Sequence, residues 1–133
     1  MSIDPALSIL IVDDYKTMLR VIRNLLSQIG LKDVDEATDG AKAADMLRMK
    51  KYGLIISDWN MEPVSGLDLL KVVRAGRAGD PNVPFIMVTA ENKVENILAA
   101  KQAGVSNYIV KPFSAETLRT KIEAVLKSAG DKT

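Results

Sequence analysis

The segment Leu54-Ile55-Ile56-Ser57-Asp58 is an apolar run that ends on a polar side chain, and this pattern recurs along the chain. The other runs are Ile9-Leu10-Ile11-Val12 before Asp13-Asp14, Phe85-Ile86-Met87-Val88 before Thr89, and Tyr108-Ile109-Val110 before Lys111-Pro112. Short unbroken runs of branched apolar residues are typical of strands buried on both faces, as in a parallel sheet. Parallel strands point the same way, so we expect three carboxylates, a hydroxyl and an amine at the edge of the sheet where α/β proteins place their sites.

Amphipathic patterns of helical length separate these runs. Apolar residues spaced by three and four positions predict helices that carry Met18, Val21, Ile22, Leu25, Leu26 and Ile29; Ala43, Ala44 and Leu47; Leu70 and Val73; Val94, Ile97 and Leu98; and Leu118, Ile122, Val125 and Leu126. The predicted N-caps are Thr38 or Asp39, Ser65 and Ser114, and the predicted helix ends are Gly30, Gly104 and Gly130. Residues 34–37 form a weak strand pattern that suits a sheet edge.

Strands and helices therefore alternate along the whole chain, without a linker or a repeat. Right-handed crossovers leave few ways to arrange such a chain, and the flavodoxin-like strand order 2-1-3-4-5 is favoured. We predict an α/β fold, a doubly wound five-stranded parallel sheet with helices on both faces. It would be a single domain over residues 1–133, with its core at about 6–129 and no output domain. This order brings Asp13, Asp14 and Asp58 to one crevice.

The composition excludes several classes of function. The 18 Lys and Arg residues balance 17 Asp and Glu residues, so neither nucleic acid nor an anionic membrane is an expected partner. No apolar run approaches the roughly 20 residues that span a bilayer, and the first residues do not resemble a secretory signal. The chain has no Cys and no His, which excludes thiolate chemistry, His-bound zinc and a phosphohistidine carrier. We expect a cytoplasmic protein.

The predicted acidic edge suits phosphoryl chemistry. Three carboxylates packed together repel one another, and burial raises the pKa of at least one of them. Mg²⁺ relieves this repulsion, since it prefers oxygen ligands and commonly joins carboxylates to a phosphoryl oxygen. A carboxylate can also be the nucleophile, and Asp58, at the end of the central strand, has the natural position for it. Lys111 and Thr89 could hold the other phosphoryl oxygens. Each residue alone is more often a cap or turn residue, so the prediction rests on their joint occurrence.

These motifs resemble those of response-regulator receiver domains, and in particular of the chemotaxis regulators within that family. The matching segments are Asp13-Asp14, Ile56-Ser57-Asp58-Trp59-Asn60-Met61, Met87-Val88-Thr89-Ala90-Glu91, Gln102-Ala103-Gly104 and Tyr108-Ile109-Val110-Lys111-Pro112-Phe113. The resemblance implies that Asp58 accepts a phosphoryl group, and that Mg²⁺ is organised by Asp13, Asp14, Asp58 and the backbone carbonyl of Asn60. It also implies that Thr89 and Tyr108 form a switch, that Lys111 acts at the phosphoryl group, and that the Lys111–Pro112 peptide bond is cis.

Such a protein signals by binding and is not an enzyme, although it phosphorylates itself with Mg²⁺ and dephosphorylates slowly. The resemblance implies a histidine kinase as phosphodonor, a flagellar motor switch protein as target, a phosphatase as a further partner, and a monomeric state. The partner surface would comprise the Val94–Gln102 helix, the last strand and the last helix, with Ile97, Tyr108 and Lys121 exposed. A phosphate sink, or a regulator of a target other than the motor, stays open as an alternative.

One segment departs from the family. Where receivers usually read Met-Pro-x-Met-Asp-Gly, this chain has Met61-Glu62-Pro63-Val64-Ser65-Gly66. Ser65 keeps the N-cap, because a hydroxyl also accepts from first-turn N–H groups. Glu62 adds a carboxylate near the predicted metal site, and we expect it to point to solvent.

Two other classes fit less well. A haloacid-dehalogenase-type phosphatase also forms an aspartyl phosphate, but it carries Asp-x-Asp after its first strand, where this chain has adjacent Asp13-Asp14. A flavodoxin-like electron carrier needs a phosphate-cradling loop there, and an acidic pair repels a phosphate.

Overall fold

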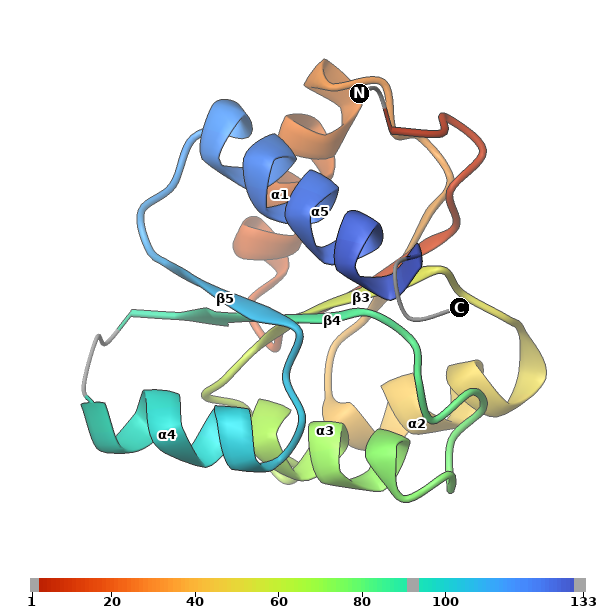
Figure 1. Ribbon diagram of the computed structural model, residues 1–133, viewed down its shortest axis with the longest axis vertical. Coiled ribbons are helices and arrows are strands. Elements are labelled where there is room, and N and C mark those ends of the chain that lie inside the picture. Colours follow the sequence, from red (N-terminus) through yellow and green to blue (C-terminus); the bar gives the residue numbers. More distant parts are fainter. Residues whose placement is uncertain (1–2, 91–93, 131–133) are drawn as a thin grey trace.

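Five parallel strands form one sheet in the order β2-β1-β3-β4-β5, which confirms the predicted topology. The computed structural model describes residues 3–90 and 94–130 (Figure 1). Strands and helices alternate as predicted: β1 Ile9–Val12, α1 Lys16–Gln28, β2 Val34–Ala37, α2 Gly40–Met49, β3 Leu54–Asp58, α3 Gly66–Arg74, β4 Phe85–Thr89, α4 Val94–Gln102, β5 Asn107–Val110 and α5 Ala115–Gly130. The weak strand β2 lies at one edge and β5 at the other.

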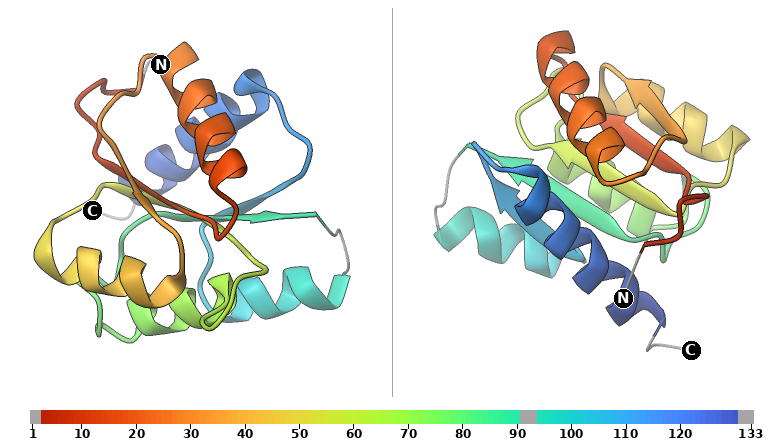
Figure 2. Two further views of the ribbon diagram at one scale, coloured as in Figure 1. Left: turned by 180° about the vertical axis from the view of Figure 1, so that it is seen from behind. Right: turned by 90° about the horizontal axis from the view of Figure 1, so that it is seen from above.

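The sheet is covered on both faces, with α1 and α5 on one side and α2, α3 and α4 on the other (Figures 1 and 2). Successive residues of a strand point to opposite faces, so each strand contributes to both cores. Ile9 and Ile11 pack toward the α1–α5 side, whereas Leu10 and Val12 belong to the core of the α2–α3 side. This double burial explains why the strands are unbroken apolar runs.

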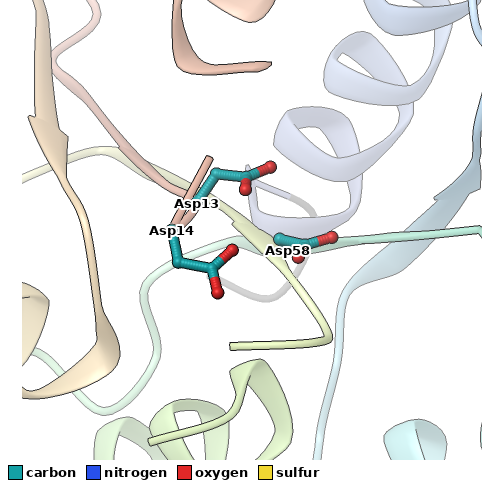
Figure 3. A group of neighbouring side chains, drawn as sticks. All are labelled: Asp13, Asp14 and Asp58. Atoms are coloured by element: carbon teal, nitrogen blue, oxygen red, sulfur yellow. The ribbon is translucent and has the colours of Figure 1, made fainter. Parts of the chain in front are cut away.

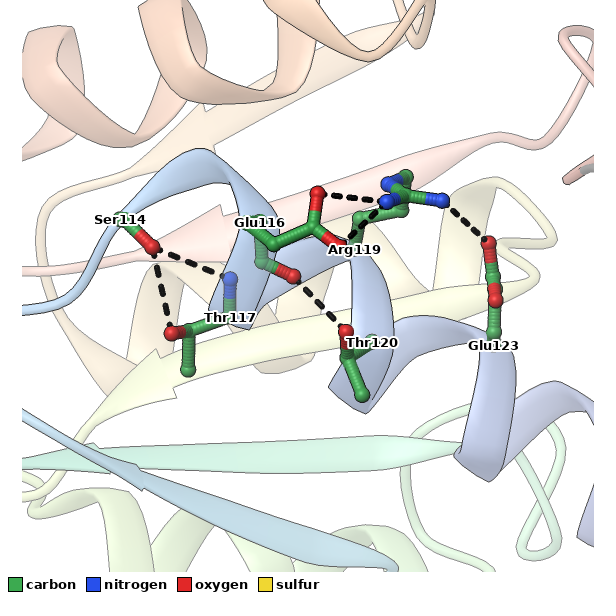
Figure 4. Close-up of polar contacts among 6 residues, drawn as sticks. All are labelled: Ser114, Glu116, Thr117, Arg119, Thr120 and Glu123. Atoms are coloured by element: carbon green, nitrogen blue, oxygen red, sulfur yellow. Dashed lines mark hydrogen bonds and ion pairs between the residues drawn. The ribbon is translucent and has the colours of Figure 1, made fainter.

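Side-chain caps begin three helices where the sequence predicted them. Asp39, not Thr38, accepts the Lys42 N–H at 2.7 Å, and Ser65 accepts the Asp68 N–H at 3.1 Å. At α5 the Ser114 hydroxyl accepts the Thr117 N–H at 3.1 Å (Figure 4). The same view shows Arg119 paired with Glu116 and Glu123 on the outer surface of α5, where ion pairs contribute little to stability (Figure 4).

Two helical residues predicted on the core side are exposed instead. Val21 is 42% exposed and Leu98 is 51% exposed. In α1 the buried stripe runs through Leu19, Ile22 and Leu26, and Val21 lies outside this stripe. Among the described side chains of α4 only Ala100 is buried, and Leu98 faces solvent. Predicted Val94 lies in α4, but its side chain falls outside the part of the chain that the structure describes.

Candidate functional site

Three carboxylates meet at the carboxyl edge of the sheet, as predicted (Figure 3). Asp13 and Asp14 directly follow β1, and Asp58 is the last residue of β3, the strand beside β1. One oxygen from each lies within 4.8 Å of the others. Asp13 and Asp58 are buried and Asp14 is exposed, so the cluster has two buried ligands and one open side.

Lys111 brings a positive charge to this cluster from the end of β5. Its Nζ donates to Asp58 Oδ1 at 2.9 Å and lies 3.8 Å from Asp13 Oδ2. The Lys111–Pro112 peptide bond is cis, as the resemblance implied. The Lys111 amine reaches across β4 to the carboxylate of β3, and it is the one cation in ion-pair contact with the cluster among the described residues.

One oxygen of the cluster has no hydrogen-bond donor among the described residues. Asp13 Oδ1 accepts the Tyr15 N–H at 2.9 Å, but Asp13 Oδ2 is buried and finds no hydrogen-bond partner in residues 3–90 and 94–130. Burial raises the pKa of Asp13 to about 6; the Tyr15 hydrogen bond opposes this, and the negative charge of Asp58 adds to it. A buried carboxylate oxygen that lacks a donor, beside two further carboxylates, is a set of ligands that suits Mg²⁺. The residues present therefore fit the predicted ion.

The open side of the cluster leads to the loop after β3. A hollow of about 430 Å³ is lined there by Asp14, Trp59, Asn60, Met61, Glu62 and Ser65. Asn60, whose carbonyl the resemblance assigns to the metal, is exposed in this loop. Glu62 is also exposed, as predicted, although it lines the same hollow as Asp14.

The backbone at Asp58 is held by contacts that the sequence did not reveal. A Cβ at Gly66 would lie 2.1 Å from the Asp58 carbonyl oxygen and 2.8 Å from Met87 Sδ, so only glycine fits the start of α3. The Gly66 N–H donates to the Trp59 carbonyl at 2.9 Å, and the Ser57 hydroxyl donates to the Asp58 carbonyl at 3.0 Å. The sequence places Gly66 only after the predicted N-cap Ser65, because this close approach is tertiary.

The predicted switch residues lie on the next two strands. Thr89 is the last residue of β4 and is 6% exposed. Tyr108 on β5 is opposite Met87 in the strand register, and its ring packs partly against the α2–α3 core. Of the predicted partner contacts, Ile97, Tyr108 and Lys121 are all half-buried, less exposed than expected, whereas Leu98 on α4 is more exposed.

Fold and site together define a class of protein. The chain is a doubly wound α/β domain whose switch point, between β1 and β3, carries a carboxylate cluster and a lysine in place of a phosphate-cradling loop. It belongs to the response regulator receiver domain family, whose model matches residues 9–123.

Known proteins support this assignment. The chain is 45% identical over 121 residues to the chemotaxis protein CheY-3 of Vibrio cholerae, covering 91% of this chain and 92% of that one. It is 46% identical over 121 residues to the chemotaxis protein CheY of Pseudomonas aeruginosa, covering 91% and 97%. A solved receiver domain of a Pseudomonas aeruginosa sensor histidine kinase superimposes with a TM-score of 0.78 at 27% identity, covering 93% and 98%, and it has a magnesium ion coordinated in its active-site cleft.

The protein is thus a CheY-like receiver domain of two-component signalling. In such a system a kinase phosphodonor and a downstream target are expected. Within residues 3–90 and 94–130, no helix is both long and apolar enough to cross a bilayer.

Proposed function

We propose that this receiver is a phosphorylation-dependent binding switch in the cytoplasm, in which Asp58 accepts a phosphoryl group from a histidine kinase. The observation that carries the proposal is the Asp58 carboxylate, buried at the carboxyl end of β3 and bonded to Lys111 at 2.9 Å. A carboxylate can attack phosphorus directly and form an aspartyl phosphate. The P–N bond of the donor then breaks, and the imidazole leaves with a proton.

Mg²⁺ would be held by Asp13, Asp14, Asp58 and the Asn60 carbonyl. When bound, it neutralises charge on the phosphoryl oxygens and on the carboxylates around them. The magnesium in the Pseudomonas aeruginosa receiver supports this assignment, as does the Asp13 oxygen that lacks a hydrogen-bond donor among the described residues.

The chain's own residues do the remaining work. Lys111, already at Asp58 Oδ1, exchanges that contact for a phosphoryl oxygen and compensates its charge. Thr89 lies at the end of the adjacent strand and would donate its hydroxyl to another oxygen of the phosphoryl group. Its movement would leave room for the Tyr108 ring and so change the surface of α4, β5 and α5. Slow hydrolysis of the aspartyl phosphate, with or without a phosphatase, would reset the switch.

We further propose a flagellar motor switch protein as the target, because the relatives named above are chemotaxis proteins. A phosphate sink and a regulator of another target remain the alternatives. The affinity gain on activation is limited by the difference between the two states, typically about 1–3 kcal/mol.

Phosphotransfer is tested by labelling the protein with a small phosphodonor or a phosphorylated kinase, with Mg²⁺ or with a chelator. Label is expected only with Mg²⁺, and Asp58→Asn should abolish it, whereas Asp45→Asn, an exposed acid on α2, should not. Label that persists undiminished in Asp58→Asn would refute the assignment.

The output is tested by binding to motor switch components with and without beryllofluoride. We expect tighter binding of the activated protein. Thr89→Ala should accept label but show a smaller gain, and Tyr108→Ala should bind weakly in both states. Equal affinity of both states for every motor component would favour the phosphate sink.

A further inference from the structure

The side chains of Asn107 and Lys121 contact Tyr108 in a way that none of the roles above explains. The Tyr108 N–H donates to Asn107 Oδ1 at 2.8 Å. Lys121 Nζ lies 3.4 Å from the same oxygen and 5.5 Å from the centre of the Tyr108 ring. The amide oxygen of Asn107 therefore contacts the backbone of Tyr108, and the ammonium group of Lys121 contacts its ring.

The arrangement joins an edge strand to the helix that packs on it. Tyr108 and Asn107 belong to β5, at the edge of the sheet, and Lys121 belongs to α5 (Figure 1). Both donors meet Asn107 Oδ1, which fixes the orientation of the amide, because a flipped amide would turn its own N–H groups toward them. The contacts thus depend on each other.

Lys121 forms no ion pair with the described residues. It is half-buried, and no carboxylate of residues 3–90 and 94–130 lies within ion-pair distance of its ammonium. Its charge is met by the face of the Tyr108 ring and by a neutral amide oxygen. A cation over an aromatic face is attracted by the negative potential of the ring.

We propose that Asn107 and Lys121 are positioning residues that hold the Tyr108 ring in the place it has in the unmodified protein. The proposal rests on the proposed function, in which the ring moves when Asp58 is phosphorylated. The ring cannot leave without breaking its contact with the ammonium group. Removal of the cation should therefore shift the equilibrium of ring positions by about two- to fivefold, the range of a partly exposed cation–π contact. Lys121 would then act before any partner binds.

Fluorine NMR of protein that contains fluorotyrosine tests this. The three tyrosines give three signals, and Tyr108→Phe identifies the one that matters. The chemical shifts of the Tyr108 signal in the free protein and in the protein with beryllofluoride and Mg²⁺ are the two reference values. Lys121→Met should move the signal of the free protein toward the value of the activated protein, whereas Lys121→Arg, which keeps a cation over the ring, should leave it in place. Lys127→Met, an exposed lysine on the same helix, is the matched control and should have no effect.

Variants of Asn107 give an independent test of direction. Asn107→Ala removes the oxygen that fixes the ammonium and should move the signal the same way as Lys121→Met. Asn107→Asp adds charge to that oxygen, holds Lys121 more firmly and should move the signal the opposite way.

Four outcomes would overturn the proposal. Three concern the variants: an unmoved signal in Lys121→Met, an equal shift in Lys127→Met, or shifts in the same direction for both Asn107 variants. The fourth is a signal that beryllofluoride does not move, because the ring would then have one position. The variants are compared without phosphodonor or partner, so these failures leave phosphorylation of Asp58 standing, which the labelling experiment tests separately.

Discussion

Asp13→Asn should make the metal-free protein more stable at neutral pH. The Asp13 side chain is buried, and its pKa is raised from 3.8 to about 6, chiefly by that burial. A carboxyl group whose pKa is higher in the folded state binds protons preferentially in that state, so the free energy of unfolding falls as the pH rises through this window. Above pH 6 the folded state carries the full free-energy cost of the buried Asp13 charge. A rise of the pKa from 3.8 to about 6 corresponds to roughly 3 kcal/mol.

Asparagine keeps the oxygen that accepts the Tyr15 N–H and removes the charge. We therefore expect Asp13→Asn to raise the free energy of unfolding by about 1–3 kcal/mol at about pH 7.5 in a chelator. The difference should be small near pH 4, where the carboxyl group is protonated in the folded state and partly protonated in the unfolded state. Added Mg²⁺ should stabilise the wild-type protein by occupying the carboxylates, and it should stabilise the variant much less.

Urea denaturation at the two pH values, with chelator and with Mg²⁺, measures these differences. Asp45→Asn is the control, because it removes one negative charge from the exposed surface of α2. It should alter the free energy of unfolding by no more than about 0.5 kcal/mol. If Asp13→Asn were less stable than the wild type in chelator at about pH 7.5, Lys111 would already compensate the Asp13 charge, and the reasoning would be wrong.

Further substitutions test the contacts around the site and the fold. Tyr52→Phe removes the hydrogen bond at 2.7 Å to Asp35 and should cost about 1 kcal/mol in thermal or urea unfolding above pH 5, where Asp35 is ionised; the loss should shrink as the pH falls, because that bond lowers the pKa of Asp35. Gly66→Ala forces a Cβ against the Asp58 carbonyl and should cost about 1–3 kcal/mol and slow the labelling of Asp58, which is checked by denaturation and by labelling rates. Ser114→Ala removes the cap of α5 and should cost about 1 kcal/mol in denaturation without changing label incorporation.

Much of the architecture could be predicted because buried parallel strands leave a strong signal in the sequence. Strands β1, β3 and β4 are buried on both faces, and a polar residue ends or directly follows each of them, so these runs revealed the strands and also the functional edge. The positions of Asp13, Asp58, Thr89 and Lys111 followed from strand direction alone. Their assigned roles stay predictions until the labelling and binding experiments are done.

What could not be predicted depends on contacts between distant segments. The helical pattern predicted α1, but it did not reveal that Val21 faces solvent, since the packing of α1 against the sheet decides that. The Asp13 oxygen lacks a hydrogen-bond donor among the described residues because of the positions of its neighbours. The contact of Lys121 with Tyr108 joins α5 to β5 and depends on how the helix is rotated on the sheet.

The two cores on either side of the sheet have an evolutionary consequence. The residues that carry the proposed chemistry lie at the ends of the strands, whereas Tyr108 packs toward the α2–α3 core. Mutations on the Tyr108 side can therefore accumulate and suit a new partner while α1 and the strands keep the carboxylates in place. One phosphoacceptor scaffold can in this way diverge toward many targets without rebuilding its chemistry.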